Sequence, residues 1–191
     1  MKVIVIDAGH GGFDPGAVNG VRMEKNDNLN MALAVQKKLQ EQGQRVIMTR
    51  NTDVFVPLLE RSAVANRNNA DIFVSLHRDS FSNISANGVT TFIQYDSAPI
   101  NAQYAENVHS KIVNAGVQSD RGVRQEDFSV LRNTLAPAML VELGFITNTI
   151  DNQLFDENFD NYATAITRGI LESLGEPYYP PAPPIVSALP T

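Results

Sequence analysis

Four side chains in this sequence have the types needed for hydrolytic chemistry: His10, Glu24, His77 and Glu142. Two imidazoles and one carboxylate around an open fourth position form the ligand set of a catalytic zinc ion. The remaining carboxylate would then be free to act as a base. The residues alone leave open which glutamate is the ligand, and because the four are far apart in the chain, the fold must bring them together.

Both histidines follow short apolar runs that are typical of buried strands. Residues 3–7 are VIVID, followed by the glycine-rich turn that contains His10, and residues 71–77 are DIFVSLH, which ends on His77. Functional groups in open α/β sheets collect beyond the carboxyl ends of the strands. We therefore expect the two imidazoles at one edge of a sheet, on condition that the two strands are neighbours.

The two glutamates are placed by a helix and by a further strand. A helix is expected over residues 27–42, with Glu24 just before its first turn. Residues 137–145, PAMLVELGF, are strand-like, and alternation places Glu142 on the face opposite Met139 and Val141. A lone carboxylate thus interrupts an apolar strand. Asp7 and Asp14 are expected to support the turn around His10 and not to bind a metal.

The remaining elements follow from apolar spacing and from glycine and proline positions. The expected strands cover residues 45–50, 88–95 and 129–132, and the expected helices cover 57–68, 100–115 and 157–174. Strands that alternate with helices predict an α/β domain with a mostly parallel sheet. The region after Gly175 holds six of the ten prolines and predicts an extended linker.

Composition limits the possible partners. The 15 basic and 21 acidic residues give a formal net charge of −6, which argues against nucleic acid or an anionic membrane surface as the main partner. The chain has no cysteine, so any metal must be bound by His, Asp or Glu. No apolar run approaches the roughly 20 residues of a membrane helix. Of the three histidines, His109 borders an apolar helical stripe, and we expect it to be structural.

A family resemblance rests on four segments that occur in this order: VIVIDAGHGGFDPGAVNG, the glutamate of RMEKN, SLHRDS and PAMLVELGFITN. Together they resemble the zinc-dependent N-acetylmuramoyl-L-alanine amidases of the amidase-3 family, which cut bacterial peptidoglycan. The similarity covers residues 2–175. It implies a single α/β domain with a twisted, mostly parallel sheet flanked by helices.

The resemblance also assigns roles to the four side chains. His10, Glu24 and His77 would bind one Zn²⁺ per chain, and Glu142 would be the catalytic glutamate. The reaction implied is hydrolysis of the amide bond between the lactyl group of N-acetylmuramic acid and L-alanine of the stem peptide. Residues 1–175 would be the catalytic domain, a monomer. Residues 176–191 would be a linker towards a missing domain that binds the cell wall.

The segment SLHRDS departs from the commonest family pattern, which has Ala-Asn after the second histidine. Arg78 and Asp79 add a charge pair there, and we expect Arg78 to contact a carboxylate of the stem peptide. The stretch between His77 and Glu142 is also short, which predicts an open groove without a blocking helix.

Three alternatives stay open at this point. The domain could be a peptidoglycan-binding module of the same fold without catalysis, although four intact site residues argue against that reading. The glycine-rich turn could bind phosphate, but its spacing matches neither common phosphate-binding motif. Within the amidase interpretation, a chain that starts directly with a strand fits a phage-type endolysin held in the host cytoplasm before release to the wall. The alternative is a secreted autolysin without its leader.

Overall fold

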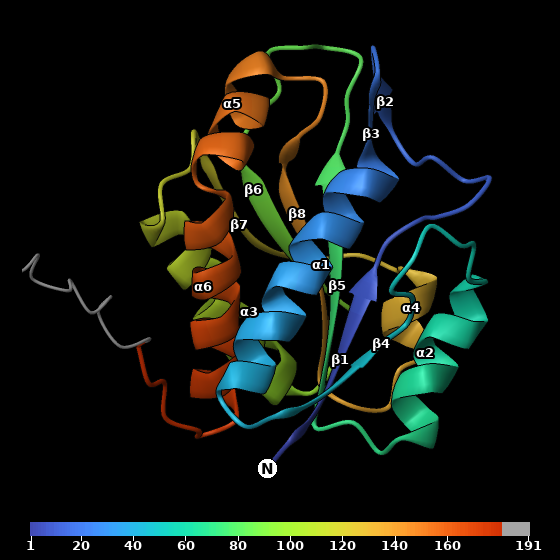
Figure 1. Cartoon of the computed structure of the whole chain (residues 1–191), viewed down its shortest axis with the longest axis vertical. Helices are drawn as coiled ribbons and strands as arrows, with labels where there is room; N and C mark the ends of the chain where they lie inside the picture. Colours follow the sequence, from blue (N-terminus) through green and yellow to red (C-terminus); the bar gives the residue numbers. More distant parts are fainter. Residues whose placement is uncertain (181–191) are drawn as a thin grey trace, which may run out of the picture.

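A computed structural model describes residues 1–180 of the chain (Figure 1). Residues 181–191, which form most of the expected linker, lie outside the described residues. One six-stranded sheet forms the centre of the molecule. Its strands, in spatial order, are β4 (Arg45–Met48), β1 (Val3–Ala8), β5 (Ile72–Asp79), β8 (Ala138–Phe145), β6 (Val89–Ile93) and β7 (Asp120–Gln125).

Four of these strands, β4, β1, β5 and β8, are parallel to one another, whereas β6 pairs antiparallel with β8. The prediction of a mostly parallel sheet is therefore confirmed. The strands β1 and β5 are direct neighbours, with Ala8 opposite Leu76. The expectation of two imidazoles at one sheet edge required these strands to be neighbours. They are, and the carboxyl ends of both strands reach the same edge of the sheet.

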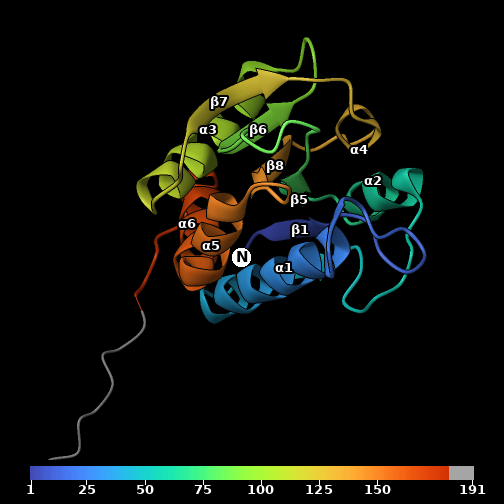
Figure 2. The same ribbon diagram turned by 90° about the horizontal axis from the view of Figure 1, so that it is seen from above.

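Helices cover both faces of the twisted sheet (Figure 2). On one face lie α1 (Glu24–Glu41), α3 (Pro99–Asn114) and α6 (Phe159–Ser173), which share a large apolar core with the strands. On the other face, α2 (Leu58–Arg67) and α4 (Ser129–Arg132) enclose a smaller apolar cluster. No helix within residues 1–180 is long and apolar enough to cross a membrane.

Several predicted elements need correction. The helix α1 begins at Glu24 and not at residue 27, because the short hairpin of β2 (Val18–Asn19) and β3 (Arg22–Met23) leads directly into it. The amide of Glu24 donates to Ala17 O, 2.9 Å away, so the preceding loop satisfies the first turn. Glu24 therefore lies inside the first turn, where its side chain is fixed by the helix.

The predicted strand 129–132 is wrong: these residues form the short helix α4, with Val130 and Leu131 both buried. The neighbouring strand β7 was not expected, because it is a polar edge strand without apolar alternation. The predicted helix 157–174 is confirmed as α6, whereas the helix before it, α5 (Thr149–Glu157), was not predicted. The side chain of Asn148 caps α5.

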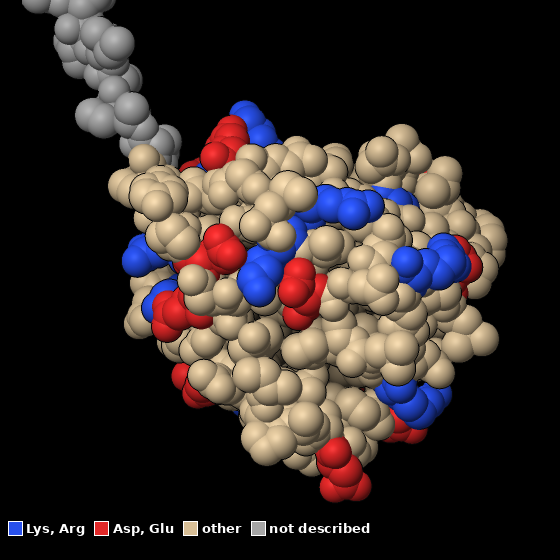
Figure 3. Space-filling model, turned by 90° about the horizontal axis from the view of Figure 1, so that it is seen from below, with Lys and Arg blue, Asp and Glu red and all other residues tan. Residues whose placement is uncertain are grey.

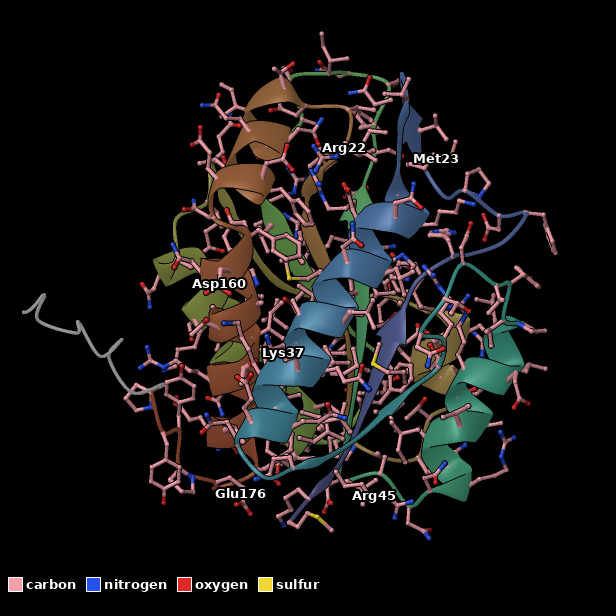
Figure 4. The ribbon with its side chains drawn as sticks, viewed as in Figure 1. Arg22, Met23, Lys37, Arg45, Asp160 and Glu176 are labelled. Atoms are coloured by element: carbon pink, nitrogen blue, oxygen red, sulfur yellow. The ribbon has the colours of Figure 1, made fainter. Side chains whose placement is uncertain are left out.

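The beginning of the expected linker contacts the domain. The amide of Glu176, which lies just beyond α6 (Figure 4), donates to Leu171 O. The backbone of Tyr179 exchanges two hydrogen bonds, of 2.7 and 2.8 Å, with the side chain of Gln42. The guanidinium of Arg168 lies over the ring of Tyr178. These contacts attach residues 176–179 to the ends of α1 and α6.

Candidate metal centre

His10 lies in a turn that begins where β1 ends at Ala8. It has a φ of 62°, in the left-handed region that costs a non-glycine residue roughly 1–2 kcal/mol. Strained backbone of this kind persists only where surrounding contacts hold it. The neighbouring Gly9 has no room for a side chain, because a Cβ there would lie 2.2 Å from the His77 ring. The glycine therefore allows the turn and the second imidazole to meet.

The two histidines and Glu24 form one compact cluster. Glu24 Oε2 lies 3.1 Å from His10 Nε2, and Glu24 Oε1 lies 2.9 Å from His77 Nδ1. The two imidazole rings meet edge to face, with centroids 5.0 Å apart. One donor atom from each residue lies within 4.8 Å of the other two. The structure thus brings together the three residues that the resemblance assigned as metal ligands.

Hydrogen bonds set the electrostatics of this cluster. Burial alone raises the pKa of Glu24, but its contacts with His10 and His77 outweigh that effect and place the pKa far below its usual range. Burial lowers the pKa of His10, yet hydrogen bonds to Glu24 and Asp14 raise it overall. Glu24 is therefore an anion that attracts positive charge to this position.

Asp14 orients the first imidazole. Its Oδ2 lies 2.8 Å from His10 Nδ1, and its Oδ1 accepts a hydrogen bond from the Gly16 amide. A carboxylate on one ring nitrogen fixes the tautomer and the ring direction, which leaves the other nitrogen for a metal. The expectation that Asp14 supports the site agrees with this geometry.

Two buried arginines stabilise the turn through hydrogen bonds to its backbone carbonyls. Arg61 pairs with Asp7 at 2.8 Å and donates to the carbonyl oxygens of Ala8 and His10. Arg50 donates to the carbonyls of Ala8 and Gly9. Both arginines are almost fully buried. Sequence reasoning missed them, because each is a single cation in an otherwise ordinary loop or helix.

Glu142 lies beside the cluster on β8, where it is in register with His77 on β5. Both residues line a cavity of about 530 Å³ that also includes His10 and Glu24. Glu142 Oε2 is buried and has no hydrogen-bond partner among residues 1–180. Burial, with the nearby charges of Glu24 and Asp79, raises the pKa of Glu142 well above its usual value. The carboxylate is thus placed to hold or release a proton inside the cavity.

The expected role of Arg78 is wrong. Its side chain is fully buried, and its guanidinium pairs with Asp27 at 2.8 Å and donates to Asn152 at 2.7 Å. It also lies over the ring of Phe155, with 4.2 Å from Cζ to the centroid. Burial lowers the pKa of Arg78 to about 10. A guanidinium with these partners links β5 to α1 and α5 and does not reach a stem peptide.

The pair of Arg78 and Asp27 is part of a polar cluster that also includes Arg22 from β3, which Figure 4 shows between the start of α1 and α5. Its guanidinium bonds both Asp27 and Asp156, at 2.7 Å each. Asp27 therefore accepts from two arginines at the first turn of α1, the turn that also carries Glu24. This cluster fixes the helix end that presents the glutamate.

The donor set fits a zinc ion. Two imidazole nitrogens and one carboxylate oxygen, close together and partly open to a cavity, are the ligands that catalytic zinc prefers. The three residues come from a turn, a helix end and a strand end that are all internally braced. His10, Glu24 and His77 would hold the ion, and Glu142 faces the same space.

Comparison with known proteins agrees with this geometry. The family profile Amidase_3, described as N-acetylmuramoyl-L-alanine amidase, matches residues 4–172. The chain belongs to the Amidase_3 family. The match covers every element from β1 to α6, and with them all four residues of the candidate site.

Relatives and solved structures of this family resemble the chain closely. The catalytic domain of CwlV, an N-acetylmuramoyl-L-alanine amidase from Bacillus (Paenibacillus) polymyxa, is 40% identical with a TM-score of 0.85, covering 92% of this chain and 99% of that one. The uncharacterized protein YqiI of Bacillus subtilis is 41% identical over 88% of this chain and 83% of its own length. The probable cell wall amidase LytH of Staphylococcus aureus is 36% identical over 82% of this chain, which spans only 52% of LytH.

Proposed function

We propose that this domain hydrolyses the amide bond between the lactyl group of N-acetylmuramic acid and L-alanine in peptidoglycan. One zinc ion would be held by His10, Glu24 and His77, and Glu142 would be the general base and acid. The observation that carries the proposal is the shared cavity: three metal-ligating side chains and a buried, unpartnered carboxylate line the same space. Membership of the Amidase_3 family supports the choice of bond.

The chain's own residues account for the proton transfers. The chemistry that zinc supplies at such a site is polarisation of the scissile carbonyl and acidification of a water molecule towards a pKa of about 7. Glu142 would take a proton from the attacking water and pass it to the leaving nitrogen of L-alanine. A carboxylate whose pKa is raised by burial suits both steps, because it accepts a proton readily and then donates it.

The test compares the unchanged chain with Glu142→Gln on purified peptidoglycan. We expect the unchanged chain to bind about one zinc and to release stem peptides with N-terminal L-alanine. Glu142→Gln should keep the zinc and lose at least about a hundredfold in activity, the range of a general acid–base group. His77→Ala should lose both zinc and activity.

Three results would contradict all or part of the proposal. New ends other than N-terminal L-alanine would assign a different bond. A metal-free and inert protein that still binds peptidoglycan would favour the alternative of a binding module without catalysis. Full activity of Glu142→Gln would leave the metal site in place and remove the role of Glu142.

The cellular setting is a further part of the proposal. An enzyme of this kind would act on the wall either as an endolysin, held in the host cytoplasm until release, or as a secreted autolysin. The net charge of −6 gives the domain little attraction to an anionic wall, so a domain after the proline-rich segment would supply the targeting. Wall binding by the 191 residues that is as tight as that of a longer form would contradict this part.

A further inference from the structure

We propose that Phe13 and Phe55 form an aromatic platform that binds sugar rings of the glycan strand next to the muramic acid that carries the scissile bond. The inference rests on the proposed function and adds to it a contact for the sugar side of the substrate. Neither residue belongs to the catalytic cluster, and neither is part of the apolar cores. Their position at the rim of the cavity is the starting point.

The two rings are exposed and stacked on each other. Phe13 is 81% exposed and Phe55 is 40% exposed, and their ring centroids are 4.3 Å apart with planes inclined by 31°. Single exposed apolar residues are common on protein surfaces. A stacked pair is different, because most of the Phe13 surface stays open although its ring already has an aromatic neighbour. Exposed apolar surface of this kind marks binding sites.

Backbone and side-chain hydrogen bonds order the two segments that carry the platform. Phe13 lies at the tip of a tight turn closed by two hydrogen bonds between Gly11 and Asp14, of 2.9 and 3.1 Å. The amide of Gly12 donates to Asp53, and Lys25 Nζ bonds both Gly12 O and Asp53 at 2.9 and 2.7 Å. These contacts join the turn of Phe13 to the loop of Phe55. A surface that is already ordered loses little entropy on binding.

The platform is continuous with the candidate active site. Phe13 follows His10 by one short turn, in the loop that runs from β1 towards β2 (Figure 1). Phe55, Val56 and Leu58 line the cavity that contains the metal-ligand cluster. When the scissile bond lies at the cluster, the rest of the substrate must extend out of the cavity along its walls. The wall that contains Phe55 is one of them.

The chemistry of the walls distinguishes the two sides of the substrate. The wall near Phe55 is apolar, and the charges beside it, Lys25 and Asp53, are paired with each other. Another part of the lining, at the end of β5, is polar and includes Asp79 and Ser80. A stem peptide carries ionised groups, whereas a pyranose ring presents a face of C–H groups to the negative face of an aromatic ring. The apolar wall therefore fits the glycan, and the polar wall fits the peptide.

The face at the opposite end of the strands offers a contrast. There, basic and acidic side chains are interspersed over the surface (Figure 3). The exposed aromatic residue Tyr179 lies at the end of α1 remote from Glu24, and its hydrogen bonds with Gln42 use backbone atoms. Tyr179→Ala thus removes an exposed aromatic ring without touching the cavity, and it is the matched control.

The test measures binding without catalysis. Glycan strands from which the stem peptides have been removed are titrated into the unchanged chain, Phe13→Ala, Phe55→Ala and Tyr179→Ala. We expect the two phenylalanine variants to bind about five- to tenfold more weakly, the usual effect of truncating a contact residue. Phe13→Tyr should bind normally, and Tyr179→Ala should match the unchanged chain. Circular dichroism of each variant establishes that it is folded.

A second substrate separates this proposal from the proposed function. Cleavage of a minimal substrate with one sugar, N-acetylmuramoyl-L-alanyl-D-isoglutamine, depends on the catalytic site alone. We expect Phe13→Ala to cleave it normally and to show a raised KM only on polymeric peptidoglycan. Normal glycan binding by both phenylalanine variants would overturn the platform. Cleavage of the minimal substrate by the unchanged chain would still support the proposed function in that case. Weaker binding of isolated stem peptides by Phe13→Ala would assign the platform to the peptide instead.

Discussion

The metal-ligand cluster and the aromatic platform lie at the base and the rim of one cavity, and the protein supports them in opposite ways. Behind His10, buried arginines pair with carbonyl oxygens and with Asp7, so the strained turn has many bonding partners. Phe13 has an ordered backbone, but its side chain is mostly exposed. Geometry at the base is fixed by polar contacts, whereas the rim keeps apolar surface available.

This difference indicates which residues determine folding and which determine binding. Polar groups that are buried and bonded are costly to disturb, because removing one partner leaves the other without solvation. An exposed ring contributes little to stability, so truncating it should lower only the affinity for a ligand. The comparison predicts a graded series of effects from the base of the cavity to its rim.

The largest effect is expected at Arg61. Arg61→Met would leave the carboxylate of Asp7, which is fully buried, without its cation. Burial raises the pKa of Asp7, and Arg61 outweighs this with help from Ser75 and Thr49. Breaking a buried pair costs about 3–5 kcal/mol of unfolding free energy, measurable by urea denaturation. Arg67→Met, which removes an exposed pair with Glu60, should leave the midpoint unchanged, and equal midpoints for both variants would contradict the comparison.

The next effect has the opposite sign. Glu142→Gln should stabilise the metal-free protein by about 1–3 kcal/mol at pH 7, because a neutral amide replaces a buried carboxyl group whose charged form lacks a hydrogen-bond partner at Oε2. The pKa of Glu142 is raised by folding, so its ionisation favours the unfolded chain. The unchanged protein should therefore lose stability as the pH rises from about 4.5, the unfolded value, through the folded value.

Thermal denaturation of both metal-free proteins over this pH range checks the sign. Glu142→Gln should show a flatter dependence on pH, and the two curves should meet at acid pH. A variant that is less stable than the unchanged chain at pH 7 would mean that Glu142 contributes to folding. Glu142 would then not be a residue that is kept at the expense of stability.

A smaller effect is expected from Asp14, which touches the cluster without belonging to it. Asp14→Ala should weaken zinc binding about 10- to 100-fold, because His10 loses the partner that fixes its ring. Asp120→Ala is the matched control, since Asp120 contacts His109 at the same distance of 2.8 Å outside the cavity. Zinc affinity is measured by competition with a chelator. Equal affinities of the two variants would show that the ring of His10 is positioned by the backbone alone.

The sequence was sufficient to predict the strand that precedes His10 and the strand that carries His77, because parallel buried strands form continuous apolar runs. Alternation alone also placed Glu142 on the face of β8 opposite Met139 and Val141, which lie in the large apolar core. The start of α1 was predicted too late, since its first turn is satisfied by backbone carbonyls of the preceding loop and not by a capping side chain. Such a contact leaves no local signal.

The roles of the arginines were harder to predict. Arg78 follows His77 in the chain, and its position suggested the substrate, but side chains alternate along a strand. Arg78 therefore points to the face where Asp27 and Asn152 lie. Arg50 and Arg61 act on β1 from loops and helices far away in the sequence. Charges that are paired only in the folded state cannot be distinguished by sequence from charges on the surface.

The smallest expected effect on stability is at the rim and is the sharpest test of the comparison. Phe13→Ala should change the free energy of unfolding by less than about 0.5 kcal/mol, as for surface substitutions, and should leave zinc affinity unchanged. Phe73→Ala, which truncates a fully buried ring on β5, should cost about 3–5 kcal/mol. Urea denaturation of the two variants measures both values. A loss for Phe13→Ala that approaches the loss for Phe73→Ala would make the stacked pair part of the packing, and the exposed ring would then serve the fold and not a ligand.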